Sequence, residues 1–340
     1  MEEVEEELVI DDDDENLDDL FVFVDHNEYE SEKITAPRYS YWKSVWRVFF
    51  KKKSNWIFLG LLFILLVFTF IYPIFSAYDQ YYMLNLYPEK VNSFQNLSPA
   101  ATFGENGVVP LTGFHIRWIL GTNEVSASVF DQLWSGTRTS LLLAFICTAI
   151  NMSIGIILGA VWGLSKTFDT IMNQIYNIIG NIPSILFITI LSYIIGSGFW
   201  QLVLALCITG WLGIAYFIRT QVIIIRDREY NLASRCLGTN IFTIVIRNIL
   251  PFMVSIIVTV LASELPGYIS SEVFLSYLGI GLSGADTPSL GTMLEKATAS
   301  GVSSRPWQFW PPVIVAGIVS VVLYVVGQNI GDASDPRTHM

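Results

Sequence analysis

The sequence has 340 residues, of which 52% are hydrophobic and only 14% are charged, well below the quarter that is usual in soluble domains. This composition excludes an ordinary soluble globular domain and indicates a membrane protein, and nothing in it suggests a nucleic-acid partner. The formal net charge of −11 is unevenly spread, because sixteen of the 30 acidic residues lie between Glu2 and Glu32. Without that segment the chain carries 19 basic and 14 acidic residues and is mildly basic.

The first 40 residues form an acidic segment that is too highly charged to bury a core of its own. We expect residues 1–40 to be a disordered cytoplasmic tail. Two roles stay open for it: a solvated extension without a specific function, or a docking segment for a basic surface on a partner protein.

About 20 apolar residues cross a bilayer as a helix, since each adds about 1.5 Å and the hydrocarbon core is about 30 Å thick. Six segments meet this requirement, which predicts an all-α polytopic membrane protein with six transmembrane helices. The first begins too far from the N-terminus, and lacks the small-residue cleavage site, to be a signal peptide. The predicted spans are Asn55–Ser76, Ser140–Leu164, Ile171–Ile195, Phe199–Phe217, Phe252–Leu275 and Pro312–Ile330.

Basic residues predict the orientation of these spans. Seven of them, ending in the run Lys51–Lys53, precede the first span and place the N-terminus in the cytoplasm. With six spans the C-terminus is also cytoplasmic, and 14 of the 19 basic residues then lie on the cytoplasmic side. We therefore expect a multi-pass protein of the cell membrane with both termini inside.

Two long segments lie outside the membrane in this arrangement. The first, Ala77–Thr139, ends with Val129, Phe130, Leu133 and Trp134 on one helical face, which predicts an interfacial helix on the outer leaflet. The second is rich in Gly, Ser and Pro and precedes the last span.

The most informative segment is the cytoplasmic loop that runs from Arg228 to Pro251. Ala233 and Leu237 lie at helical spacing on it, Gly238 stands at a C-cap position, and Asn240 is a good N-cap for a second helix. This pattern predicts a short amphipathic helix, a turn and the start of the next span. Such a helix either lies on the inner leaflet or binds a partner protein.

The fifth predicted span contains two acidic residues, Glu264 and Glu272. A carboxylate in hydrocarbon is costly, so each should face the pore, a partner helix or water. We expect Pro266 and Gly267 to open the helix toward an aqueous cavity. As pore residues the two acids could contact the amine or backbone of a peptide, and otherwise a neighbouring helix satisfies them.

Other polar and small residues in the spans have simpler explanations. Arg138 and Arg219 are expected to mark span ends by snorkelling, with their charged groups in water. Gly155 and Gly159 form a G-x-x-x-G pattern that predicts close packing of the second span against another helix. Asn151, Asn181 and Pro183 could soften their helices at the cavity.

Catalytic and metal-binding patterns are missing from the sequence. The three cysteines, Cys147, Cys207 and Cys236, form no C-x-x-C pair, and the three histidines lie far apart. No segment matches the P-loop pattern, so the chain is not expected to bind ATP itself. We predict neither an enzyme nor a metal site, and no cofactor bound by this chain.

The cytoplasmic loop resembles the EAA signature of ABC-importer permeases, in which a short helix docks into a groove of the ATPase subunit. Leu232-Ala233-Ser234 stands where Glu-Ala-Ala is typical, Gly238 matches the family glycine, and Leu250-Pro251 closes the motif. The motif glutamate is missing, although oligopeptide-type permeases often have Glu-Tyr slightly upstream, as Glu229-Tyr230 does here. The resemblance implies ATPase docking through Glu229, Tyr230, Ala233, Ser234, Arg235, Leu237 and Gly238.

Further motifs narrow the resemblance to the C-type permease subunit of oligopeptide and dipeptide importers and cover roughly Trp46 to Arg337. Departures occur at Ser126–Ser128 and at Asp131-Gln132, where the family pattern has Gly-Arg-Asp and Ser-Arg. The matching segments are Tyr72–Asp79, Leu120–Glu124, Gly136–Leu141, Glu272–Gly281, Gly331-Asp332 and Asp335–Arg337.

This family resemblance implies an importer of two homologous permeases, two ATP-binding subunits that hold ATP and Mg²⁺, and an extracellular peptide-binding protein. The chain would supply half of the pore, in contact with lipid and with the peptide substrate, and no catalytic chemistry. Two alternatives stay open: a permease for nickel or another small solute, and an ion-coupled secondary transporter.

These predictions divide the chain into consecutive parts. They are an acidic tail (1–40), a first transmembrane segment with its basic flank (41–80), an extracellular segment with an interfacial helix (81–137), a permease core of five transmembrane helices with its coupling loop at 223–248 (138–334), and a C-terminal tail (335–340).

Overall fold

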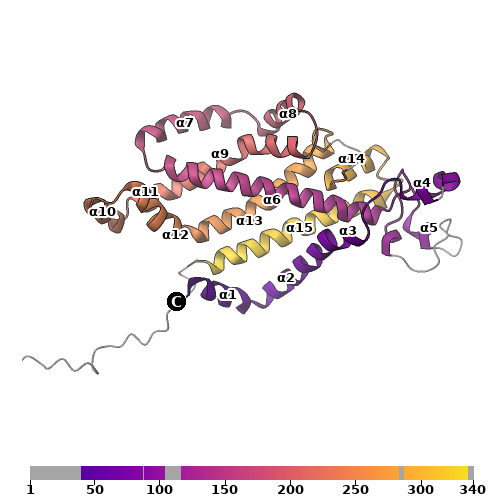
Figure 1. Ribbon diagram of the computed structural model, residues 1–340, viewed down its shortest axis with the longest axis horizontal. Helices are drawn as coiled ribbons and strands as arrows, with labels where there is room; N and C mark the ends of the chain where they lie inside the picture. The colour runs from indigo at the N-terminus through magenta and orange to yellow at the C-terminus, as the bar shows by residue number, and fades with distance from the viewer. Residues whose placement is uncertain (1–39, 87, 104–115, 283–286, 336–340) are drawn as a thin grey trace, which may run out of the picture. The chain divides into compact units, whose positions relative to one another are not determined.

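The computed structural model describes residues 40–86, 88–103, 116–282 and 287–335. Their regular structure is helical, apart from one isolated antiparallel bridge between Thr122 and Ser128. All the helices belong to one compact unit, Tyr41–Met340 (Figure 1). The acidic tail before residue 40 and the last five residues lie outside the described residues, so the predictions for them stay predictions.

Five helical stretches within the described part of the chain are long and apolar enough to cross a membrane, and a sixth candidate is a bent pair. This supports the predicted all-helical fold with up to six spans. The five stretches are Lys53–Phe75, formed by α2 (Lys53–Leu66), η2 (Val67–Ile71) and α3 (Tyr72–Phe75), and α6 (Val129–Trp162), α9 (Phe199–Arg226), α13 (Val254–Tyr277) and α15 (Pro306–Ala333). The bent pair is α7 (Lys166–Gly180) with α8 (Ser184–Ile195).

Shorter helices flank and connect these spans. On the side of the first span they are α1 (Tyr41–Lys51), α4 (Tyr82–Leu86), η3 (Pro88–Phe94), α5 (Pro99–Phe103) and η4 (Ile116–Trp118). In the second half of the chain they are α10 (Glu229–Cys236), α11 (Ile241–Ile244), η5 (Val245–Ile249), α12 (Leu250–Phe252) and α14 (Leu290–Ala299).

The second span begins earlier than the sequence predicts and absorbs the expected interfacial helix. Ser128 caps α6, its side chain accepting a hydrogen bond from the Asp131 amide at 3.1 Å. Val129 and Leu133 are buried and pack with residues of α14, and Trp134 stacks on Phe68 of the first span with ring centroids 4.9 Å apart. The apolar face of this segment is therefore buried by the protein itself and does not lie on the membrane surface as a separate helix.

Glycines let α6 approach α9 closely, as the G-x-x-x-G pattern predicts. A Cβ added at Gly155 would lie 2.6 Å from Ile214, and one added at Gly159 would lie 2.5 Å from the Ala215 carbonyl oxygen. Since no real Cβ atom sits so close, only glycine fits at these positions. The prediction of close helix packing is confirmed.

The third and fifth spans differ from the prediction in opposite ways. The third is broken, with α7 and α8 meeting at an angle of 81° around Asn181 and Pro183. The fifth stays continuous as α13 although Pro266 lies inside it. Pro266 removes one amide donor, but the helix around it is packed against α15 and α6, so the expected opening at Pro266 and Gly267 does not occur.

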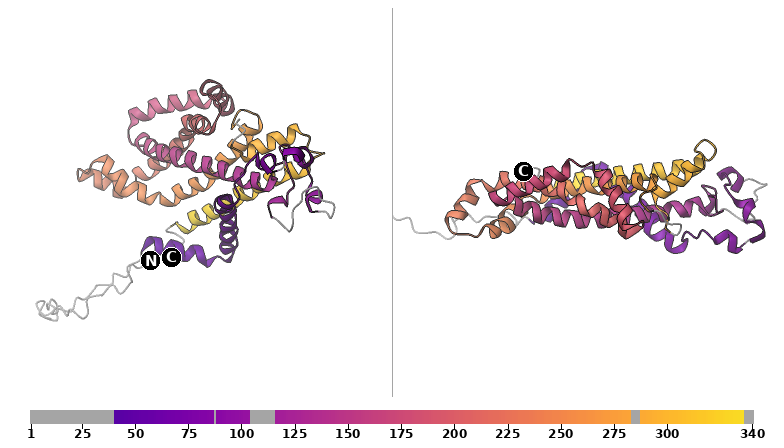
Figure 2. Two further views of the ribbon diagram at one scale, coloured as in Figure 1. Left: turned by 45° about the vertical axis from the view of Figure 1, so that its right-hand side comes forward. Right: turned by 90° about the horizontal axis from the view of Figure 1, so that it is seen from above.

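Figures 1 and 2 show α7 at the opposite edge of the helical unit from α1 and α2.

Two wider helical turns precede prolines. The π-helical segment η2 ends two residues before Pro73, and η5 ends two residues before Pro251. A proline lacks an amide donor and its ring crowds the carbonyl four residues earlier, so a wider turn relieves the conflict at both places. The second of these turns lies in the segment between α9 and α13 and is followed by α12.

Candidate functional site

The loop between α9 and α13 contains the predicted short helix, α10, whose C-terminus is closed by glycine. Gly238 has φ +80°, a left-handed conformation that glycine adopts without strain. The Gly238 amide donates to the Arg235 carbonyl at 2.9 Å and the Thr239 amide donates to the Ser234 carbonyl at 3.1 Å. These two bonds form a Schellman motif, which confirms the predicted C-cap.

The chain restarts as a helix at the predicted N-cap. The Asn240 side chain accepts a hydrogen bond from the Phe242 amide at 3.2 Å, and α11 follows at once. The capped end of α10 and the capped start of α11 make the turn a defined structure. The caps supply hydrogen-bond partners for backbone groups that a helix end otherwise leaves unpaired.

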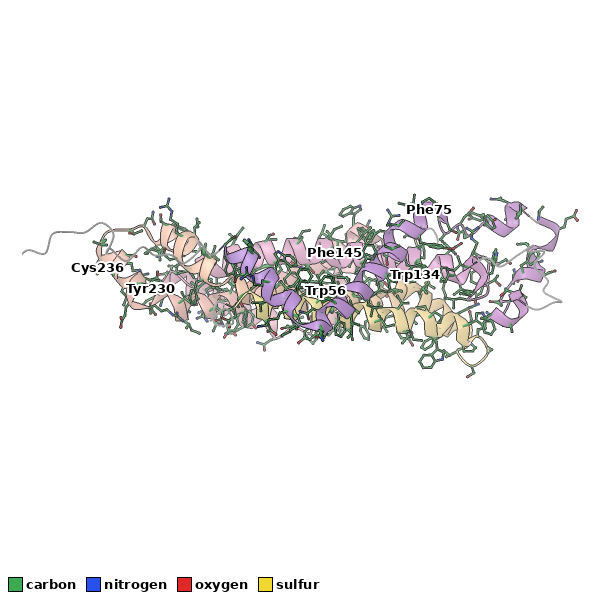
Figure 3. The ribbon with its side chains drawn as sticks, turned by 90° about the horizontal axis from the view of Figure 1, so that it is seen from below. Trp56, Phe75, Trp134, Phe145, Tyr230 and Cys236 are labelled. Atoms are coloured by element: carbon green, nitrogen blue, oxygen red, sulfur yellow. The ribbon has the colours of Figure 1, made fainter. Side chains whose placement is uncertain are left out.

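Apolar side chains on α10 and at its C-cap are exposed. Tyr230 is 45% exposed, Leu232 43% and Leu237 86%. Figure 3 shows Tyr230 and Cys236 at the opposite end of the helical unit from Phe75, the last residue of the first span. Of the residues predicted for docking, Ser234 and Arg235 are half-buried and the others are exposed: Glu229, Tyr230, Ala233, Leu237 and Gly238.

One side chain of α10 is fully buried, and sequence reasoning missed it. Asn231 donates a hydrogen bond to the Ile225 carbonyl at 2.9 Å and accepts one from the Asn248 amide group at 3.2 Å. It therefore joins α10 to the end of α9 and to η5. A polar residue on a polar loop carries no sequence signal of burial, so the sequence could not have indicated it.

Arginines next to α10 hold the loop to the ends of the spans. Arg226 donates to the Gly163 carbonyl at 2.7 Å, which links the loop to the end of α6, and also pairs with Asp227 at 2.9 Å. The hydrogen bond from Arg226 lowers the pKa of Asp227 and so favours its carboxylate form. Arg228 stacks over the ring of Phe252 at 4.7 Å.

Glu272 of α13 is fully buried in a network of serines. Its carboxylate accepts hydrogen bonds from Ser140 at 2.6 Å and Ser276 at 2.9 Å. The Leu290 amide at the start of α14 donates to the same Ser140 hydroxyl at 3.2 Å, and the Leu282 amide donates to Ser276 at 3.2 Å. The network joins α6, α13 and α14 at one buried point.

Glu264 has a different environment on the same helix. It is half-buried, and its carboxylate makes no hydrogen bond or ion pair with any described residue. One turn later Tyr268 is buried, and its hydroxyl accepts a hydrogen bond from Asn151 of α6 at 2.7 Å. A Cβ at Gly210 of α9 would lie 2.5 Å from this hydroxyl, so a glycine there makes room for the pair.

Two ion pairs at the helix ends were not predicted. The Arg219 guanidinium pairs with Asp169 of α7, at 2.9 Å between Nη2 and Oδ2, and lies 5.5 Å over the Tyr216 ring. Arg219 is therefore engaged with protein groups rather than snorkelling to water, whereas Arg138 is exposed. Toward the other end of the unit, Asp131 accepts hydrogen bonds from Tyr72 at 2.6 Å and from Arg117.

The described residues contain no group of three or more His, Cys, Asp or Glu side chains that could hold a metal ion. The cysteines Cys147, Cys207 and Cys236 are all free thiols.

Two family models match parts of the chain. Residues 151–340 match the family model described as the binding-protein-dependent transport system inner membrane component. Residues 40–99 match the N-terminal transmembrane domain of oligopeptide transport permease C.

Curated relatives cover nearly the whole chain. The oligopeptide transport system permease protein AmiD of Streptococcus pneumoniae is 44% identical over 94% of this chain and 97% of its own length. The dipeptide transport system permease protein DppC of Bacillus subtilis is 30% identical over 94% of this chain and 93% of its own. The oligopeptide permease OppC of the same organism is 29% identical over 92% of this chain and 94% of its own.

The chain therefore belongs to the inner-membrane permeases of binding-protein-dependent ABC transporters, and within them to the oligopeptide and dipeptide family. It is a multi-pass membrane protein and a non-catalytic transmembrane subunit. This membership excludes the ion-coupled secondary transporter considered above.

Proposed function

We infer that this chain is the pore-forming permease of an ABC importer for oligopeptides or dipeptides, and that α10 couples it to the ATPase subunits. The observation that carries the coupling role is a helix closed by a glycine turn at its end, with the apolar side chains of Tyr230, Leu232 and the C-cap residue Leu237 exposed. The peptide substrate is supported by the names of relatives that match more than nine-tenths of the chain, and these favour peptides over nickel or another small solute.

Docking of α10 into a groove of an ATPase subunit would bury these exposed side chains. Burial of apolar area contributes about 25 cal/mol per Å², so a few side chains supply several kcal/mol of gross binding energy. Glu229 and Arg235 lie at the two ends of the helix and give it polar groups that can orient it. ATP and Mg²⁺ are then bound and used on the partner subunits, and none by this chain.

A movement of α10 reaches the membrane spans through two polar connections. The first is Asn231, which holds α10 to the Ile225 carbonyl of α9 and to Asn248 of η5. The second is Arg226, which holds the Gly163 carbonyl at the end of α6. Closure of the ATPase pair would in this way pull on α6, α9 and α13 together and switch the permease between inward-facing and outward-facing states.

The two acids of α13 have separate proposed roles. Glu264 makes no hydrogen bond or ion pair with the described residues, and we assign it to the pore, where it can contact the amine or backbone of a passing peptide. Both carboxylate oxygens of Glu272 accept hydrogen bonds from serines, and we assign it to holding α6, α13 and α14 in register.

The complex in this proposal contains a second homologous permease, two ATP-binding subunits and an extracellular peptide-binding protein. Both termini and α10 lie in the cytoplasm, as the distribution of basic residues favours. Purification of the tagged chain in mild detergent, with mass spectrometry of what remains bound, tests the assembly. Recovery of a second permease and two P-loop ATPases is expected, and a chain recovered alone or as a homodimer contradicts it.

Transport itself is tested by reconstituting the recovered complex into liposomes with the peptide-binding protein outside. ATP-dependent accumulation of a labelled oligopeptide or dipeptide is expected. Accumulation of Ni²⁺ in place of either peptide would transfer the assignment to a small-solute importer.

A further inference from the structure

The helix α7 is attached to the rest of the chain along one face only. Asp169 pairs with Arg219 of α9, and the ring of Tyr176 stacks on that of Tyr216 with centroids 4.4 Å apart. Met172, between them in sequence, is buried. These contacts hold α7 beside α9 and leave the other two sides of the helix open.

The two open sides differ in chemistry. One carries exposed isoleucines, which suit lipid: Ile171, Ile175, Ile178 and Ile182. The other carries three exposed carboxamides, Gln174, Asn177 and Asn181, which we call the amide stripe. Their spacing of three and four residues places them on one side of a helix, about a quarter turn from the isoleucines and opposite the attached face.

The amide stripe lies at the depth of the membrane interior. Tyr216, which stacks on Tyr176, lies 17 residues after the start of α9 at Phe199 and ten before its end at Arg226. At about 1.5 Å per residue it is roughly 25 Å from one end of this span and roughly 15 Å from the other. The side chains of Gln174 and Asn177 make no hydrogen bond with a described residue, and Asn181 donates one to the Asn177 carbonyl at 2.7 Å, which leaves its oxygen without a donor. Carboxamides with unsatisfied groups cannot be dehydrated cheaply, so they do not face hydrocarbon here.

The stripe ends at the break of the third span. The angle between α7 and α8 is 81°, and every residue from 180 to 186 is exposed. Irregular backbone at membrane depth is tolerated only where it is buried in protein or lines a water-filled cavity. A straight helix of a partner could not follow a face that bends by this angle, so the broken region favours water over a packed helix.

We propose that the amide stripe of α7 lines the aqueous path of the transported peptide and hydrogen-bonds its backbone. This inference rests on the proposed function. A carboxamide both donates and accepts hydrogen bonds and carries no charge, so it can pair with the N–H and C=O groups that every peptide repeats. From Gln174 to Asn181 the stripe covers eight residues and rises about 10 Å, which is the length of about three extended peptide residues.

The stripe gives the importer contacts that do not depend on the side chains of the peptide. Backbone recognition by neutral amides holds any sequence weakly, which suits a path that must release what it binds. Glu264, on a different helix, would add a contact to the amine.

Thiol labelling of the reconstituted complex tests where the stripe lies. Asn177→Cys and the adjacent Ile178→Cys are compared in a Cys236→Ser background, with a charged, membrane-impermeant thiol reagent and the parent as blank. We expect Asn177→Cys to react at least tenfold faster than Ile178→Cys, and a transported peptide to slow that reaction. Equal rates, an unreactive Asn177→Cys or a rate unchanged by peptide would overturn the proposal.

Uptake measurements test what the stripe does. Replacing Gln174, Asn177 and Asn181 together by Leu should raise the KM for peptide or lower uptake at least tenfold, with the second permease still recovered. The matched control replaces Ile171, Ile175 and Ile178 by Leu and should transport normally. In the single-site series, Asn177→Gln should retain most of the activity that Asn177→Leu loses.

The outcomes separate this inference from the proposed function. If the unaltered complex imports peptide and the triple Leu variant does so equally well, only the stripe proposal is wrong. If the triple variant loses the second permease, the stripe is a subunit interface and the proposal is also wrong. If the unaltered complex imports no peptide at all, the proposed function itself fails.

Discussion

The α6–α9 contact and the α10 loop both depend on glycine, but for opposite physical reasons. Gly159 has ordinary helical geometry and no room for a side chain, since an added Cβ would meet the Ala215 carbonyl at 2.5 Å. Gly238 has nothing within 4 Å of an added Cβ, yet its φ of +80° strains any other residue. The first glycine serves packing and the second serves chain direction.

This difference separates stability from coupling. The α6–α9 contact is buried and holds two spans together, so changes there should destabilise the fold and lower the amount of protein recovered. The α10 turn is exposed and is held by a few polar bonds, so changes there should leave a folded permease that cannot follow its ATPase. Graded substitutions at both places test that separation.

The largest effect is expected from Gly159→Leu. Its side chain would overlap the backbone of α9, and overpacking of this kind costs about 1–3 kcal/mol or more. We expect at least a tenfold loss of recovered complex in detergent. Gly213→Ala on α9, where an added Cβ meets nothing within 4 Å, is the matched control and should be recovered normally.

Gly238→Pro should uncouple the transporter without unfolding it. Proline cannot adopt φ +80° and removes the amide that bonds to Arg235, so the Schellman turn is lost. Peptide uptake should fall about tenfold or more per ATP hydrolysed, with recovery of the permease unchanged. Gly238→Asn, which tolerates the left-handed conformation, should keep most of the coupling, and normal coupling in the proline variant would count against the role of this loop.

Glu272→Leu should weaken the junction of α6, α13 and α14. It leaves the hydroxyls of Ser140 and Ser276 without their acceptor, and unsatisfied buried groups cost about 1–3 kcal/mol each. A clear fall in the thermal midpoint of the purified complex is expected. Glu272→Gln retains an acceptor oxygen, so its thermal midpoint should fall less. Equal transport defects at full stability in both variants would instead indicate a role in the pore.

Leu237→Ala should have the smallest effect. The side chain is 86% exposed, so its removal should leave the stability of the isolated permease unchanged. Loss of its burial in an ATPase groove would cost about 1–2 kcal/mol of docking energy, a roughly five- to thirtyfold weaker ATPase affinity. Titration of the permease with the ATPase subunit measures this affinity. Ile224→Ala, at an exposed position on α9, is the control and should leave it unchanged.

The turn after α10 could be predicted from the sequence because its signals are local. Gly238 and Asn240 are capping residues at fixed offsets from an apolar pattern, and both occupy the predicted caps. The Gly155–Gly159 spacing likewise indicated close packing without naming α9. In each case the signal lies within a few residues of the feature that it predicts.

Long-range contacts decided what the sequence pattern could not. The apolar face at Val129–Trp134 suits either a membrane surface or a protein core, and the packing of α14 and Phe68 selects the core. Pro266 suits a break or a continuous helix, and the neighbours of α13 keep it continuous. Asn231 is polar on a polar loop, and only its partners at Ile225 and Asn248 reveal an anchor.

The sequence by itself determined the class of protein, the approximate spans and the α10 turn, because hydropathy and capping are properties of neighbouring residues. The tertiary structure alone decided that the third span bends by 81° at the soft point expected near Asn181 and Pro183, that Glu272 is enclosed by serines and that Glu264 is not. Those outcomes depend on which distant helices pack against each position, and burial and hydrogen bonding over such distances leave no periodic mark in the chain.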